Sequence, residues 1–144
     1  MSSKFNQLNN PQVNIKTKLA MYWTSRMFLY IYADYFGLMV PGHLERMIAV
    51  ETPVGPTTPG LLIVFSVLLI IPALMILGSV VLKPSINKWL NIVVGIFYAI
   101  ISILMIVGDI NNEWMAYFVL YQFVELGVFA LIVVTAWKWP KEVR

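Results

Sequence analysis

The run from Leu61 to Leu82 reads LLIVFSVLLIIPALMILGSVVL and contains no charged side chain. A helix needs about 20 such residues to cross the ~30 Å hydrocarbon core of a bilayer. Three similar runs occur elsewhere in the chain. Together the four runs predict helices over residues 19–40, 61–82, 88–108 and 114–138. Because the connections are short, we expect one antiparallel bundle. The predicted fold class is all-α, an integral membrane antiparallel four-helix bundle whose principal partner is the lipid bilayer.

The composition supports this class and excludes others. Hydrophobic residues make up 60% of the chain and charged residues only 12%, against about 25% charged in globular proteins. Cysteine is absent, which excludes disulfides and thiolate metal sites. The single histidine, His43, is insufficient for a zinc or two-histidine haem site and is interpreted as a polar loop residue. We therefore expect no metal, no cofactor and no nucleic-acid partner.

The charges divide between the two ends of the predicted bundle. One set of segments carries eight lysines and arginines: Lys4, Lys16, Lys18, Lys83, Lys88, Lys138, Lys141 and Arg144. The opposite connections carry Glu45, Glu51, Asp109 and Glu113 with one cation, Arg46. By the positive-inside rule we predict a multi-pass membrane protein with both termini cytoplasmic. Residues 1–18 are predicted to be a flexible cytoplasmic tail, 19–140 the membrane domain and 141–144 a second tail.

The longest connection, residues 41–60, is predicted to hold a short helix. Its apolar residues Leu44, Met47 and Ile48 share one side of a helix, which favours a segment lying at the outer interface. Whether this loop is a lid or only a connection stays open. Thr58 followed by Pro59 is a typical helix start.

Two features of the predicted bundle concern its polar groups. Pro72 is expected to kink its helix and to free a backbone carbonyl, which in lipid needs a neighbour or a cavity. A packing kink is favoured over a binding role. The helix over 88–108 places Asn91, Gly95, Tyr98, Ser102 and Asp109 along one stripe. This stripe must face the bundle interior or a partner subunit.

The stretch from Tyr30 to Gly42, YIYADYFGLMVPG, places the carboxylate of Asp34 inside an apolar run. An intramembrane carboxylate normally faces the interior and has a partner. Glu125 is the best candidate, because at ~1.5 Å per residue both lie about 20 Å from the cytoplasmic end. Arg26 is assigned to the inner interface, although it can also reach inward.

The pair Asp34 and Glu125 is predicted to form a ligand-binding or proton site. Its remaining lining residues are Tyr30, Tyr98, Tyr121 and Gln122. A dry shared pocket would disfavour charging both carboxylates and so retain one proton. The alternative, given equal weight, is a hydrogen-bonded structural network with Tyr30, Tyr121 and Gln122.

Several motifs resemble those of the DoxX-like group of small bacterial four-helix membrane proteins, most closely an uncharacterised branch. They are the segments 31–34, 41–42, 58–60, 87–91 and 136–140, together with Glu125. The resemblance spans residues 19–140 and implies the four-helix fold and a location in a bacterial inner membrane. It also implies a link to respiratory, redox-stress or assembly roles, and it supplies no catalytic residue.

Three functions remain open from the sequence. The first is binding of a hydrophobic, cationic or lipid-like small molecule, or proton-coupled transport, at the Asp34 and Glu125 site. A transport path through four helices implies a homo-oligomer. The second is a non-catalytic accessory or assembly subunit that binds a larger membrane partner through the stripe on the helix over 88–108. The third, ranked last, is a membrane enzyme acting on a sterol-like or quinone-like molecule.

Overall fold

The computed structural model describes residues 11–52 and 55–140. Its long helices are α1 (Ile15–Gly37), α3 (Pro59–Val81), α4 (Pro84–Asp109) and α5 (Ala116–Trp137). The short elements are helix α2 (His43–Ile48), strands β1 (Glu51–Thr52) and β2 (Gly55–Pro56), and the 3-10 turn η1 (Glu113–Met115). The two strands pair antiparallel in one small hairpin. The prediction of an all-α fold is confirmed apart from this hairpin.

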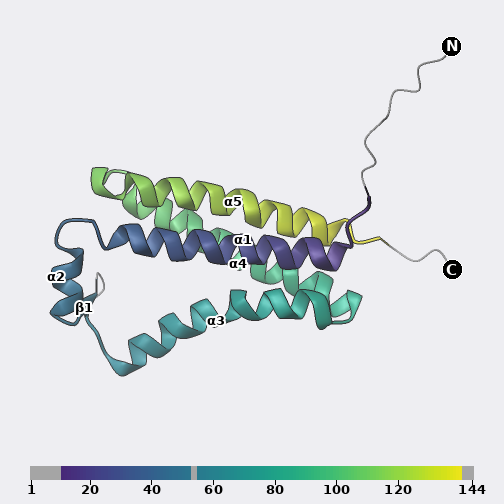
Figure 1. Ribbon diagram of the computed structural model, residues 1–144, viewed down its shortest axis with the longest axis horizontal. Coiled ribbons are helices and arrows are strands. Elements are labelled where there is room, and N and C mark those ends of the chain that lie inside the picture. Colours follow the sequence, from purple (N-terminus) through teal and green to yellow (C-terminus); the bar gives the residue numbers. More distant parts are fainter. Residues whose placement is uncertain (1–10, 53–54, 141–144) are drawn as a thin grey trace, which may run out of the picture.

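The four long helices lie lengthwise beside one another (Figure 1). Helices α4 and α5 form the closest pair, and α1 packs against both α3 and α5. The described chain begins and ends at the same end of the molecule, which also holds the α3–α4 connection; we call it the terminal end. The opposite end carries α2 and the hairpin, and we call it the α2 end.

Three of the helices are long and apolar enough to cross a membrane. They are Pro59–Val81, Pro84–Asp109 and the segment Glu113–Trp137, judged by length and composition. Within the described residues, α1 does not meet the same criterion. The physical reason is its polar content: Arg26 and Asp34 interrupt a helix that also contains several tyrosines. The chain is thus compatible with a bilayer through three helices.

Some helix boundaries differ from those predicted. Helix α1 begins at Ile15, so residues 15–18 are helical although they were assigned to the tail. Asn14 is its N-cap, and the Asn14 side chain accepts a hydrogen bond from the Lys16 backbone N–H at 2.8 Å. Helix α4 begins at Pro84, because proline is tolerated in the first turn. Residues 11–14 of the predicted N-terminal tail precede the helix, and residues 1–10 and 141–144 lie outside the described part.

The start of α3 and the short helix α2 agree with the sequence. The Thr58 hydroxyl accepts a hydrogen bond from the Leu61 backbone N–H at 3.2 Å, and Pro59 is the first residue of α3. Such caps satisfy backbone donors that a helix leaves free at its N-terminus. Helix α2 covers His43–Ile48 within the predicted connection. Its position relative to a bilayer interface stays a prediction.

Pro72 lies inside α3 and frees a carbonyl, as predicted. A proline cannot donate to the carbonyl four residues earlier, which here belongs to Leu68. The hydroxyl of Tyr98 on α4 donates to this carbonyl at 2.7 Å. Figure 1 shows that α3 bends, and that its first half diverges from α1 toward the α2 end. This one hydrogen bond therefore satisfies the Leu68 carbonyl that the kink leaves free, and it also links α3 to α4.

A buried amide network ties three helices together toward the terminal end. Trp23 on α1 donates through Nε1 to Asn91 Oδ1 on α4 at 2.7 Å. Asn91 donates to Asn87 Oδ1 at 2.6 Å, and Asn87 donates to the Ser79 carbonyl on α3 at 2.6 Å. Both asparagines are fully buried. Most of the predicted stripe of α4 therefore faces the interior of the chain, with Asn91, Gly95, Tyr98 and Ser102 all buried.

Lysines complete the terminal end by capping helix C-termini. Lys16 donates to the carbonyl oxygens of Val80 and Leu82 at 3.1 and 2.7 Å. Lys88 donates to the Trp137 carbonyl at 3.0 Å. The last carbonyls of a helix lack partners within the helix, and a cation there also complements the helix dipole. The terminal end is consequently fastened by polar contacts between α1, α3, α4 and α5.

The bond at the kink predicts a coupling between Tyr98 and Pro72. We expect Tyr98→Phe to lower the free energy of unfolding by about 1–3 kcal/mol, because it leaves the Leu68 carbonyl unsatisfied. In a Pro72→Ala background the backbone N–H of residue 72 becomes available to that carbonyl. The same Tyr98→Phe change should then cost about 1 kcal/mol less. Denaturant unfolding in detergent micelles measures both values.

Tyr121→Phe is the matched control for this cycle. Tyr121 is a half-buried tyrosine on α5 whose hydroxyl makes no hydrogen bond to another described residue. Its substitution should cost the same in both backgrounds. An equal cost of Tyr98→Phe with and without Pro72 would contradict the assignment of the hydrogen bond.

Candidate functional site

An ion pair lies in the middle of the bundle. Arg26 on α1 and Glu125 on α5 approach to 3.5 Å between Nε and Oε2. Their side chains are 5% and 2% exposed. Arg26 is therefore inside the bundle, where it faces α5: the structure shows the inward alternative and not the interface position that the sequence analysis preferred. A buried charge needs such a partner, because moving either charge from water into an apolar interior is costly.

Aromatic rings enclose the Arg26 guanidinium. Its central carbon lies 4.8 Å from the ring centroid of Tyr30, 4.9 Å from Tyr98 and 5.9 Å from Phe129. A desolvated cation–π contact contributes about 2 kcal/mol. Tyr98 and Phe129 stack on each other, and Trp23 contacts Tyr98 edge-on and Phe129 at a tilt in the same cluster. The cation is thus held by ring faces from α1, α4 and α5 as well as by Glu125.

The pair nevertheless leaves polar atoms without hydrogen bonds. Arg26 Nε and Nη1 and Glu125 Oε1 are buried and have no hydrogen-bond partner among the described residues. The 3.5 Å contact is an ion pair but too long for a strong charge-assisted hydrogen bond. Nearly all buried polar groups in proteins are bonded to protein or water. The centre of the bundle therefore holds unsatisfied hydrogen-bonding capacity.

Asp34 lies elsewhere. It is eight residues after Arg26 on α1, which corresponds to about 12 Å along the helix toward the α2 end. Its side chain is exposed, and no ion pair or hydrogen bond joins it to Glu125 in the described part of the chain. Arg26 takes the position beside Glu125 that the sequence analysis gave to Asp34. Asp34 is left as a carboxylate without a cationic partner among residues 11–52 and 55–140.

A cavity of about 620 Å³ lies beside Asp34 at the α2 end. Residues of α1, α2, β1, α3, η1 and α5 line it. Its wall is mainly apolar, with Leu38, Met47, Phe65, Met115 and Phe118 among the lining residues. Sites of this size with an apolar wall and few polar groups are typical of small-molecule binding. The divergence of the first half of α3 leaves this space open.

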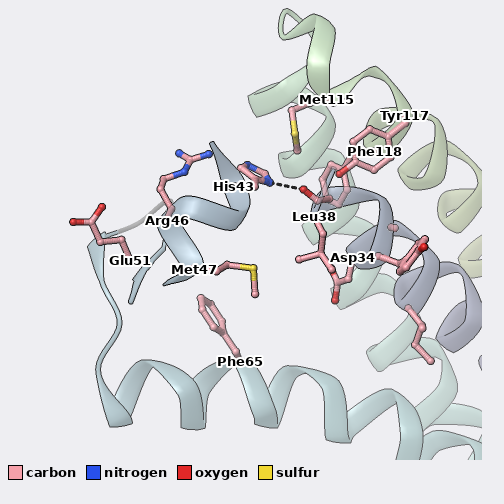
Figure 2. A pocket seen from close by; sticks show the side chains of 14 residues that line it. Asp34, Leu38, His43, Arg46, Met47, Glu51, Phe65, Met115, Tyr117 and Phe118 are labelled. Carbon is pink, nitrogen blue, oxygen red and sulfur yellow. Dashed lines mark hydrogen bonds between the residues drawn. The ribbon is translucent and has the colours of Figure 1, made fainter. Parts of the chain in front are cut away.

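Figure 2 shows how the side chains face the cavity. Met47 from α2 and Phe65 from α3 point into the space, and Asp34 approaches it from α1 on the opposite side. Arg46 and Glu51 extend from the outer rim. Asp34 is consequently the charged group closest to the apolar interior of the cavity.

His43 and Arg46 hold the α2 segment in place. His43 Nδ1 is 3.0 Å from the Gly37 carbonyl, which fastens α2 to the end of α1. Arg46 Nε donates to the Gly42 carbonyl at 3.2 Å within its own segment. Gly42 has φ of +78°, a conformation that suits glycine and lets the chain turn into α2. The segment therefore covers the open end between α1 and α3.

The other predicted site residues fall into two groups. Tyr30 and Tyr98 contact Arg26, and Tyr98 also bonds to α3. Gln122 is 5% exposed and Tyr121 is half-buried on α5. None of these four residues lines the cavity described above. The structure therefore gathers Tyr30, Tyr98 and Glu125 around Arg26 and places Asp34 at a separate wall.

Sequence reasoning missed Arg26 as the partner of Glu125, and it missed Met47 and Phe65 as cavity residues. The spacing of Arg26, Tyr30 and Asp34 by four residues placed all three on one face, which was a usable signal for Arg26. Phe65 had no such signal, because it is one apolar residue within an apolar run. Its role depends on where α3 bends.

Comparison with known families identifies the chain's relatives only at the family level. Residues 7–144 match the model of DUF6326, a family of unknown function, and the chain belongs to this family. No curated protein and no solved structure matches the chain. The resemblance to the DoxX-like group stays a prediction.

The buried pair predicts an asymmetric response to substitution. We expect Arg26→Met to lower the free energy of unfolding by about 3–5 kcal/mol, because Glu125 then stays buried without its partner. The double variant Arg26→Met/Glu125→Leu should recover part of this loss, since an apolar pair of similar volume removes the unpaired charge. Unfolding in detergent micelles gives the comparison.

Arg46→Met is the matched control for the same side-chain change. Arg46 is exposed and bonds only within its own segment, so its loss should change stability by less than about 1 kcal/mol. Equal effects of the two arginine substitutions would contradict a buried pairing of Arg26.

Proposed function

We propose that this protein is a membrane protein that binds an amphipathic, lipid-like small molecule in the cavity at the α2 end. The apolar part of the molecule lies against Phe65, Met47 and Leu38, and its polar head lies at Asp34. The observation that carries this proposal is the unpaired Asp34 carboxylate in the wall of a mainly apolar cavity of about 620 Å³. An intramembrane ionisable residue is a functional candidate by default.

The proposal includes a four-helix membrane bundle in which α1 crosses the bilayer with the other three. Helix α1 has 23 residues, as does α3. It packs lengthwise against α3 and α5, and its most polar group, Arg26, is buried among them. Lysines at the terminal end favour a bacterial inner membrane with both termini cytoplasmic. The cavity then lies at the periplasmic side, and kinship with the DoxX-like group is part of the same proposal.

Entry from the bilayer is supported by the shape of α3. Its first half diverges from α1 (Figure 1). Ile31 on α1 and Phe65 on α3 line the cavity and are 57% and 41% exposed. An apolar molecule dissolved in lipid can therefore reach the wall between α1 and α3 without crossing water. This geometry favours a lipid-like ligand over a hydrophilic one.

Binding is favoured over transport for a single chain. A transported molecule needs a path to the terminal end, where the Trp23–Asn91–Asn87 network joins α1, α3 and α4. Proton-coupled transport would therefore require a homo-oligomer or a large rearrangement. An accessory role stays open, but the predicted docking stripe on α4 is buried within the chain, so a partner would need another surface. No enzyme chemistry is part of this proposal.

A photoreactive long-chain alcohol tests whether the cavity binds amphipathic molecules. We expect a diazirine-bearing alcohol in nanodiscs to label residues of the cavity wall in native protein. Met47→Trp fills the cavity from α2 and should reduce this labelling by more than about threefold, because a bulky side chain then occupies the binding volume. Peptide mapping by mass spectrometry measures labelling at each site.

Leu44→Trp provides the matched control on the same helix. Leu44 is exposed on α2 and does not line the cavity. It should leave labelling unchanged. Labelling that is spread evenly over the lipid-facing helices, or that responds equally to both tryptophans, would overturn the proposal.

A further inference from the structure

We infer that the cavity selects a singly charged organic cation, because the unpaired Asp34 carboxylate in its wall lies beside an Arg26–Glu125 pair that neutralises itself. This inference rests on the proposed binding of an amphipathic molecule and names the chemical class of its head group. It is independent of transport and of any partner.

Among the three charged side chains Arg26, Glu125 and Asp34, one carboxylate is in excess. Arg26 is the single cation among the buried side chains of the described chain, and its 3.5 Å contact is with Glu125. Glu125 is 1% exposed and therefore cannot turn to water for compensation. Releasing Arg26 toward Asp34 would leave Glu125 as an isolated buried charge, which is costly. Arg26 is thus committed to Glu125, and Asp34 has no ion-pair partner among the described residues.

The groups at the cavity rim do not supply the missing cation. Arg46 bonds to the Gly42 carbonyl, and Glu51 lies near it on the rim with the opposite charge. His43 is engaged with the Gly37 carbonyl. The rim of charged side chains therefore adds no net positive charge next to Asp34.

Two tyrosines that line the cavity also favour a cation. From α1, Tyr35 lines the cavity with Asp34, and Tyr117 lines it from α5. Aromatic ring faces attract cations. Arg46 and Glu51 also line the cavity with opposite charges, so the Asp34 carboxylate leaves the lining with one negative charge in excess.

A monovalent head group matches this arrangement better than the alternatives. An anion would be repelled by Asp34, and a dication would exceed the single uncompensated charge. A neutral head group would cover the carboxylate without supplying a counter-charge, which is unfavourable. An organic cation with apolar substituents satisfies the carboxylate and fills the mainly apolar volume at once.

Competition between two ions of the same shape provides the test. Tetraphenylphosphonium and tetraphenylborate differ in the sign of their charge and little in size. Each is titrated against labelling of the cavity by the photoreactive alcohol, in detergent micelles, with empty micelles as the blank. We expect the phosphonium to halve labelling of native protein at a concentration at least about tenfold lower than the borate, given the strength of a close charge contact near a protein surface.

Asp34→Asn should reduce this preference to less than about threefold, because the amide keeps the size but loses the charge. Asp109→Asn is the matched control, since it removes the same charge at the α2 end from a residue that does not line the cavity. It should keep the preference. Glu125→Gln is the second variant: it leaves Arg26 without its counter-charge and should also abolish the preference.

The outcomes distinguish a failure of cation selection from a failure of the proposed amphiphile binding. Equal competition by the two ions in native protein, with cavity labelling intact, overturns cation selection and leaves amphiphile binding standing. A preference that survives Asp34→Asn also overturns the inference. Labelling that does not depend on the cavity in the first place overturns the proposed function itself.

Discussion

The ion pair between Arg26 on α1 and Glu125 on α5 constrains how these two helices pack. Two opposite charges inside an apolar bundle must stay together, because separating them leaves a charge that nothing nearby compensates. This requirement fixes the rotation of α1 against α5. It also draws the rings of Tyr30, Tyr98 and Phe129 around the guanidinium. With α1 fixed in this way, Asp34 faces the α2 end and not Glu125.

The two ends of the molecule differ because their polar contacts differ. At the terminal end, Trp23, Asn91 and Asn87 bind one another, and Lys16 caps α3. Toward the α2 end, the part of α3 that precedes Pro72 diverges from α1. The Tyr98 hydroxyl donates to the carbonyl that the kink leaves free. The same bond that stabilises the bend therefore limits how far α3 follows α1. A closed end and an open end result, and the cavity belongs to the open one.

Much of the fold follows from patterns that the sequence displays. Long apolar runs predict the helices, Thr58 and Pro59 predict the start of α3, and the polar stripe of α4 predicts its inward face. Pro72 predicts a free carbonyl, because the missing N–H is a property of the residue itself. The site was less predictable. A pairing between helices depends on their rotation, which a helical periodicity does not determine between two candidate partners such as Asp34 and Arg26.

The cavity could not be predicted from the sequence for a related reason. Its volume depends on how far α3 diverges and on where α2 crosses the opening, and both are results of packing. The polar residues of the predicted site were identified, but they divide between a buried pair and a cavity wall. Apolar residues such as Met47 and Phe65 carry no local signal that separates a cavity wall from a lipid-facing surface.

Arg26 pairs with Glu125, and Asp34 has no ion-pair partner among the described residues. Solid-state NMR with guanidinium nitrogens labelled with ¹⁵N and side-chain carboxyl carbons labelled with ¹³C measures this pairing directly in a bilayer. We predict a close arginine–carboxylate contact that disappears in Glu125→Gln and persists in Asp34→Asn. A contact that persists in Glu125→Gln but disappears in Asp34→Asn would contradict the pairing of Arg26 with Glu125.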